Sequence, residues 1–236
     1  MNTALKGVLA ALCLVPAAAL GAEGAYRLDR SPHEPTDLVS MQAGARLFVN
    51  YCLGCHGAQY MRYNRLTELG LTEQQIKDNL LFTADKVGET MKIPLEAKAG
   101  KQWFGVAPPD LSVVSRSRGA DWVYTYLRTF YRDPKTATGW NNAVFENVAM
   151  PHALWGMQGE RAYDREKNQW REITKGSHSQ VEYDMAVRDL VNFLVYVGEP
   201  AASERKAIGI AVLFVLLGVL FPLTYWLKKE YWKDVT

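Results

Sequence analysis

Two cysteines and a histidine lie within five residues of one another in the stretch NYCLGCHG, residues 50–57. Cys52 and Cys55 are three positions apart, and His56 follows at once. Residues three and four apart share one face of a helical turn, so this spacing places two thiols beside one imidazole. Three chemistries use such a set: a redox-active dithiol pair, a zinc site, and covalent attachment of haem, for which C-x-x-C-H is the sequence signal.

The rest of the chain favours haem over the two rivals. A dithiol pair ordinarily belongs to a βαβ unit and would leave His56 without a role. Zinc needs about four ligands, but the third cysteine, Cys13, lies in a segment expected to be removed, and the other histidines lack ligand spacing. Haem has two vinyl groups that can each take one thiol, and an iron that an imidazole can bind. We therefore predict one covalently bound haem c, held through Cys52, Cys55 and His56.

The ligand opposite His56 decides what such a haem can do. A thioether raises the potential and suits electron transfer, whereas an open position permits ligand binding. Met41 and Met185 fall on predicted helices and are expected to be packing residues. Met61 is only five residues beyond His56, which is too close along the chain to cross the haem plane easily.

Met150 has the best context among the remaining candidates. It ends the segment NNAVFENVAM and is followed by Pro151, so an apolar loop with a proline stop can hold its side chain over one haem face. Met91, Met157 and His152 stay open as rivals. We predict Met150 as the second axial ligand.

Apolar stripes with a helical period predict the elements that hold these residues. Residues 36–52 predict a helix that runs into the haem motif, capped by Thr36 or Asp37. Residues 179–200 predict a second helix, opened by the capping-box pair Ser179 and Glu182.

Shorter elements are predicted between these two helices. One helix begins at Thr72, with Gln75 at the capping-box position, and another covers residues 120–133. Residues 156–179 are polar and predict either a short hairpin or an irregular loop. No strand alternation is apparent, so the predicted fold is mainly α. With the haem motif, the body is predicted to be a cytochrome c-type haem domain with long loops. One C-terminal transmembrane helix is predicted to follow it.

Both ends of the chain carry apolar segments. Residues 1–22 have the pattern of a secretory signal peptide, with cleavage expected after Gly21 or Ala22. Residues 207–227 lack any charge and, at ~1.5 Å per residue, are roughly 31 Å long, which matches a ~30 Å hydrocarbon core. Residues 23–206 are then a periplasmic haem domain, and residues 228–236 a lysine-rich cytoplasmic tail, as the positive-inside rule favours.

The charge of the central body is balanced. It carries 23 of the 27 basic residues and 23 of the 25 acidic residues. Without a basic excess there is no indication of nucleic-acid binding. The predicted location is the bacterial inner membrane, with a single span and the haem domain in the periplasm.

Several segments together resemble one family. These are YCLGCHG, APPDLSVVSRSRGADWVYTYL, NNAVFENVAMP, the C-terminal span and KKEYWKDV. The combination resembles bacterial cytochrome c1, the haem-c subunit of the cytochrome bc1 complex, or quinol–cytochrome c reductase. The resemblance covers nearly the whole mature chain, and its APPDLS block and single C-terminal anchor are much more specific than C-x-x-C-H.

The resemblance implies roles for further residues. The axial methionine of the family matches Met150, and its haem-lining PPDLS segment matches residues 108–112. A ligating imidazole usually donates its other N–H to a fixed acceptor, and the carbonyl of Pro108 or Pro109 is suited to serve His56. The family's propionate-binding arginine matches Arg118.

This sequence departs from the pattern of the family at two points. The spacing from the matched arginine to the following helix is shorter here than in the family, so Arg116 stays possible as the propionate partner. Phe104 stands where many members of the family carry a polar residue.

The function implied by the resemblance is a one-electron relay. A Rieske iron–sulfur protein reduces the haem, and the haem reduces a cytochrome c acceptor, within a complex that contains cytochrome b. The chain is expected to perform no bond chemistry on a substrate of its own. The competing interpretations are an anchored cytochrome c that feeds a terminal oxidase directly, and a haem-based sensor.

Overall fold

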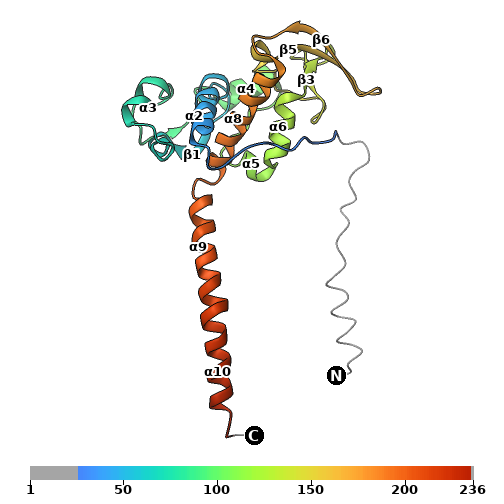
Figure 1. Cartoon of the computed structure of the whole chain (residues 1–236). Helices are drawn as coiled ribbons and strands as arrows, with labels where there is room; N and C mark the ends of the chain where they lie inside the picture. Colours follow the sequence, from blue (N-terminus) through green and yellow to red (C-terminus); the bar gives the residue numbers. More distant parts are fainter. Residues whose placement is uncertain (1–25, 235–236) are drawn as a thin grey trace.

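Two long helices form the centre of the chain in the computed structural model, which describes residues 26–234. Helix α2 spans Leu38–Leu47 and continues into a π-helical turn, η1, over Phe48–Cys52. Helix α8 spans Gln180–Gly198. Figure 1 shows α2 and α8 side by side, although they are far apart in the sequence. Both of the long predicted helices in the body are confirmed.

Side-chain caps determine where these two helices begin. The Asp37 carboxylate accepts the backbone N–H of Ser40 at 3.0 Å, so Asp37, rather than Thr36, caps α2. Ser179 and Glu182 form the predicted capping box at the start of α8. Each cap satisfies backbone N–H groups that a helix end leaves without a partner.

Helices α2 and α8 approach each other most closely at Gly44. A Cβ atom added there would lie 2.0 Å from the carbonyl oxygen of Asp189, so only glycine allows this crossing. The Ser40 hydroxyl donates to the Asp189 carboxylate at 2.7 Å beside it. Phe48 and Phe193 then pack with ring centroids 5.6 Å apart. The crossing therefore positions η1, which carries the first cysteine of the haem motif.

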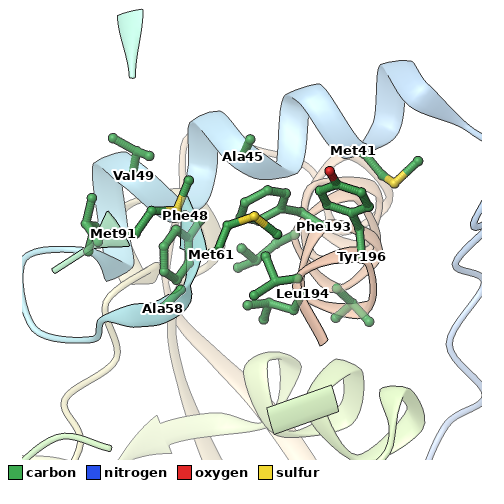
Figure 2. Close-up of a cluster of buried hydrophobic side chains, with 14 of the residues drawn as sticks. Met41, Ala45, Phe48, Val49, Ala58, Met61, Met91, Phe193, Leu194 and Tyr196 are labelled. Atoms are coloured by element: carbon green, nitrogen blue, oxygen red, sulfur yellow. The ribbon is translucent and has the colours of Figure 1, made fainter. Parts of the chain in front are cut away.

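The hydrophobic core lies mainly along this helix pair and the strand that follows the haem motif. Figure 2 shows part of it, with side chains contributed by α2, η1, α8 and the segments around residues 58–61 and 91. The labelled members are Met41, Ala45, Phe48, Val49, Ala58, Met61, Met91, Phe193, Leu194 and Tyr196. Met185 does not belong to the core: its exposed fraction is 50%, so the expectation that it packs is wrong. It falls outside the apolar stripe of α8.

The shorter helices surround this pair. Their bounds are η2 Tyr63–Leu69, α3 Glu73–Asn79, α4 Ala97–Phe104, α5 Val114–Ser117, α6 Ala120–Arg128 and α7 Trp155–Gln158. Thr72 and Gln75 make the predicted capping box of α3. The helix predicted over residues 120–133 is too long, because the chain leaves α6 after Arg128 and pairs as a strand.

Residues 26–234 contain three antiparallel strand pairs, two of them in segments where the sequence shows no strand alternation. Strand β1 (Ala58–Arg62) pairs with β2 (Thr90–Met91), and β3 (Phe130–Arg132) pairs with β4 (Trp140–Asn142). Ladders of two or three residues are too short to produce a visible alternation in sequence. Strands β5 (Gly159–Asp164) and β6 (Gln169–Lys175) form a hairpin, which confirms the hairpin interpretation of residues 156–179.

One long apolar helix leaves the body at the C-terminal end (Figure 1). It comprises α9 (Ala202–Phe214), a π-helical turn η3 (Val215–Leu220) and α10 (Phe221–Tyr231). Its stretch Glu204–Tyr231 is long and apolar enough to cross a membrane and is not buried against the rest of the described chain. This helix fits the predicted single-pass anchor. The predicted signal peptide, residues 1–22, lies outside the described residues.

Candidate functional site

One largely apolar pocket brings the predicted haem-binding residues together. Three chain segments form its walls: the haem motif, the loop after α4, and the loop before α7. Its lining residues are Tyr51, Cys52, Cys55, His56, Phe104, Val106, Pro108, Pro109, Ala149, Met150, Pro151 and Ala153. Of the predicted site residues, all except Arg118 therefore line this pocket.

The haem motif begins where α2 ends. The N–H of Leu53 donates to the carbonyl of Phe48, five residues earlier, and this closes the π-helical turn of η1. The N–H groups of Cys55 and His56 then both donate to the carbonyl of Cys52, at 3.0 and 2.8 Å. This tight turn puts two thiols and one imidazole on the wall of the same pocket.

The environment of the two thiols is apolar. Burial, together with the neighbouring Cys55, raises the pKa of the Cys52 thiol to about 12. A nucleophilic dithiol enzyme needs the opposite shift, because the thiolate is its reactive form. Within residues 26–234, no group of three or more His, Cys, Asp and Glu side chains is arranged to hold a metal ion. The site therefore resembles neither a redox-active dithiol nor a closed zinc centre.

His56 is held by a backbone carbonyl. Its Nδ1–H donates to the carbonyl oxygen of Pro109 at 2.7 Å. Of the two candidate prolines, Pro109 is thus the acceptor, and Pro108 contributes only to the pocket wall. Desolvation lowers the pKa of His56, which keeps the imidazole neutral. With Nδ1 carrying the proton, Nε2 has a free lone pair for a metal.

The segment that carries Pro109 is pinned to the chain just after the haem motif. The Asp110 carboxylate accepts the N–H of Gln59 at 2.9 Å and the N–H of Ser112 at 2.8 Å. The N–H of Leu111 donates to the carbonyl of Gly57 at 2.7 Å. These bonds fix the distance between the proline carbonyl and the imidazole that it orients.

Met150 reaches the pocket from a loop that two asparagines organise. Asn142 Oδ1 accepts the N–H groups of Val144 and Phe145, at 2.9 and 3.1 Å, and Asn141 Oδ1 accepts that of Asn147 at 2.9 Å. These asparagines lie on β4, so the loop is fastened to the strand pair beside α6.

The phenol of Tyr126 also contacts this methionine. Its hydroxyl donates to Met150 Sδ at 3.3 Å. Burial raises the pKa of Tyr126, so the phenol stays protonated and remains a donor.

The rival axial ligands have other surroundings. Met91 and Met157 are buried in the core. His152 is 2% exposed, stacks on Phe130 with centroids 4.8 Å apart, and pairs through Nε2 with the amide oxygen of Gln158 at 2.8 Å. None of these three rivals lines the pocket, which leaves Met150 as the thioether in its wall.

The two candidate arginines point to different partners. Arg116 pairs with Glu199, near the start of the C-terminal helix. Arg118 lies over the ring of Trp122, 5.2 Å from its centroid, and Trp122 stacks in turn on Tyr126 at 4.7 Å. Trp122 thus connects Arg118 with Tyr126, the residue that contacts Met150. Arg116 instead forms an ion pair with Glu199.

Sequence reasoning missed several members of the site. Tyr51, Val106, Ala149 and Ala153 line the pocket without having been singled out. The small alanines on either side of Met150 were a usable signal, since small side chains leave space beside a ligand. The contact of Tyr126 with Met150 has no signal in the sequence, because it depends on how α6 packs against a distant loop.

The residues present fit a covalently bound haem. Two thiols, a neutral imidazole with its second nitrogen fixed, and a thioether share one pocket whose other walls are apolar. An apolar lining suits the faces of a porphyrin, and a nitrogen–sulfur axial pair is the set that raises the potential of cytochromes c.

Comparison with known proteins gives a consistent result. The model of the Cytochrome C1 family matches residues 29–235. The chain is 45% identical to the cytochrome c1 of Allochromatium vinosum, over 95% of this chain and 96% of that protein. It is 47% identical to a Nitrosomonas europaea protein named ammonia monooxygenase gamma subunit, over 98% of both chains, and 27% identical to the cytochrome c1 of Rhodospirillum rubrum, over 84% and 83%.

Proposed function

The chain belongs to the cytochrome c1 family, and on that premise we propose that it relays single electrons from a Rieske iron–sulfur protein to a cytochrome c acceptor. It is a cytochrome of bc1-type complexes and carries covalently bound haem c. Such complexes also contain cytochrome b and Rieske subunits. The haem supplies reversible one-electron chemistry, and the protein holds it, sets its potential and presents it to partners.

Each residue of the pocket has one task in this proposal. Cys52 and Cys55 would form the thioether links to the haem, and His56 and Met150 would bind its iron. Pro109 fixes the orientation of the imidazole through the 2.7 Å hydrogen bond. The observation that carries the proposal is that Met150 meets the haem motif in one apolar pocket, although it comes from a remote loop.

The propionates of the haem need a cationic partner near the pocket. Arg118 is the better of the two candidates, because Arg116 already pairs with Glu199. A guanidinium can bind carboxylates in bidentate fashion, and stacking on Trp122 restricts its motion.

The C-terminal helix supports a single-pass arrangement. The stretch Glu204–Tyr231 is long and apolar enough to span a membrane. In the proposed arrangement it anchors the subunit, with the haem domain in the periplasm and the C-terminus in the cytoplasm. Lys228, Lys229 and Lys233 follow the uncharged run of residues 207–227, and lysines favour the cytoplasmic side.

The decisive experiment is purification of the membrane complex through a tag on this chain. We expect b-type haem and a Rieske electron paramagnetic resonance signal in stoichiometric amounts. Rapid mixing with a quinol should reduce the haem of this chain only while the Rieske centre is present. A preparation with a terminal oxidase and neither b-type haem nor a Rieske signal would support direct feeding of an oxidase instead.

The Nitrosomonas europaea relative motivates a second candidate, a haem subunit of a monooxygenase. The same purification discriminates, since this candidate predicts monooxygenase subunits in place of the Rieske protein. The pocket favours electron transfer in either case. His56 and Met150 both line it, and together they would supply the two protein ligands of an electron-transfer haem.

A further inference from the structure

Tyr126 contacts the proposed axial methionine and packs between two aromatic neighbours. Its ring stacks on Trp122 with centroids 4.7 Å apart and planes at 11°. Its other neighbour is Phe130, 5.1 Å away in an edge-to-face arrangement. A ring clamped in this way has little freedom to turn its hydroxyl away from Met150 Sδ, 3.3 Å distant.

The backbone of the same tyrosine holds the methionine loop. The side-chain N–H of Asn142 donates to the Tyr126 carbonyl at 2.7 Å. Through its oxygen, Asn142 organises the first turn of the loop that ends at Met150. Tyr126 therefore contacts the start of the loop through its carbonyl and the end of the loop through its hydroxyl. Both contacts help to position the Met150 sulfur.

A thioether sulfur has two lone pairs. One can bind iron while the other accepts a hydrogen bond. A bond donated to the sulfur withdraws electron density and weakens its donation to ferric iron. Such outer contacts orient metal ligands and tune the metal. Stabilising the ferric state less than the ferrous state raises the reduction potential.

We propose that Tyr126 is a positioning residue, whose hydroxyl donates to Met150 Sδ, holds that sulfur at the haem iron and raises the haem potential. The inference rests on the proposed function, because it takes Met150 as the axial ligand. It goes beyond that function by assigning a role to a side chain outside the ligand set.

The test compares four altered forms of the full-length haem protein: three substitutions, and a protein with 3-fluorotyrosine at position 126. Tyr126→Phe removes only the hydroxyl and keeps the clamped ring. Tyr124→Phe, on the same helix, removes a phenol whose ring instead faces the guanidinium of Arg128, 4.6 Å from its centroid. Met150→Leu removes the sulfur itself. The readouts are the midpoint potential and the weak near-infrared sulfur-to-iron band of the ferric protein.

The variants should change the midpoint potential in different directions and by different amounts. Tyr126→Phe should lower the potential and shift or weaken the sulfur-to-iron band, while Tyr124→Phe should leave both as in the wild type. Placing 3-fluorotyrosine at position 126 makes the hydroxyl a stronger donor, so it should move the potential in the opposite direction. A purely structural role for the ring would give no such reversal.

Two outcomes overturn the inference, and they are distinguishable. If Met150→Leu abolishes the band but Tyr126→Phe and the fluorinated residue leave the potential unchanged, Met150 is the ligand and Tyr126 has no role in tuning it. If Met150→Leu leaves both band and potential unchanged, the ligand assignment itself is wrong, and the role of Tyr126 is rejected with it.

Discussion

His56 and Met150 reach the pocket by different means. His56 sits in a single tight turn, and its side chain hydrogen-bonds to the carbonyl of Pro109. Met150 ends a loop that depends on asparagine side chains of β4 and on Tyr126. Local geometry therefore secures the imidazole, whereas tertiary contacts secure the thioether. Of the two proposed iron ligands, the methionine should be the first to dissociate when the fold is perturbed.

Replacing Met150 with leucine tests the ligand directly. The sulfur-to-iron band should disappear and the potential should fall substantially, since axial ligands move haem potentials over a span of about 0.8 V. Met157→Leu is a matched control, because Met157 is buried in the core rather than in the pocket wall. Visible and near-infrared spectra with a redox titration measure both effects. A Met150→Leu protein with the wild-type band would disprove the assignment.

The two arginines make a second pair for comparison. Arg118→Ala should lower the haem potential, because propionates that are less well neutralised stabilise the ferric state. Arg116→Ala should leave the potential unchanged, since Arg116 pairs with Glu199 away from the pocket. A redox titration of each variant shows which arginine contacts the propionates. The reverse result, with a shift only in Arg116→Ala, would move the propionate contact to Arg116.

At the scale of secondary structure, the packing of α2 against α8 is the feature most sensitive to substitution. Alanine at Gly44 would gain about 1 kcal/mol of helix propensity in an isolated helix. Here its Cβ would lie 2.0 Å from a backbone oxygen of α8, and overpacking of this kind costs about 1–3 kcal/mol or more. Because the obstacle is backbone rather than a flexible side chain, the clash should outweigh the propensity.

Gly44→Ala should therefore lower the free energy of unfolding by about 2 kcal/mol. Gly88→Ala is the control, since nothing lies within 4 Å of a Cβ atom at that position. Denaturant unfolding of the ferric protein, followed by the haem absorbance, gives both values. Equal stabilities for the two variants would show that α2 and α8 can separate without cost.

The elements that sequence predicts well are those whose ends carry local signals. Ser179 with Glu182, and Thr72 with Gln75, mark helix starts within four residues of chain. The pairing of Phe130–Arg132 with β4 has no such signal, because each strand is three residues long and nearly all of these residues are buried, so no polar–apolar alternation arises. The apolar pattern of α6 therefore predicts a helix that continues through β3.

The features of the site also fall into two groups: those that a short local segment predicts, and those that depend on tertiary packing. The haem motif can be read from one short segment, and the proline acceptor was narrowed to two neighbouring residues. The choice of Pro109, and the contact of Tyr126 with Met150, depend on how distant segments pack. Met185 was misjudged for a related reason: lying on an amphipathic helix does not place a residue on its buried face.

At the scale of the whole molecule, the haem pocket and the C-terminal helix are separate parts. The pocket draws its walls from segments between residues 51 and 153, and residues of the apolar helix do not contribute to it. Figure 1 shows α9 and α10 extending away from the body that contains α2, α6 and α8. At the junction, Glu199 pairs with Arg116 on one side and Arg205 on the other. These pairs lie at an exposed site, where ion pairs contribute little to stability.

A chain that ends at Ala202 should therefore fold around its haem without the membrane. Exported with a signal peptide, it should be soluble and keep its covalent haem and the reduced spectrum of the full chain. It should exchange electrons with a small cytochrome c, since that requires only an exposed haem edge. The full-length protein in detergent is the control for both measurements.

The same truncation should abolish quinol oxidation in membranes, because in the proposed arrangement the apolar helix holds this subunit beside cytochrome b and within reach of the Rieske protein. Quinol–cytochrome c reductase assays on membranes that carry only the truncated chain measure this loss. If the truncated chain precipitates or loses its haem, the body does not fold independently and the boundary at Ala202 is wrong. If those membranes instead retain full activity, contacts of the haem domain alone assemble the complex and the helix serves only as a tether.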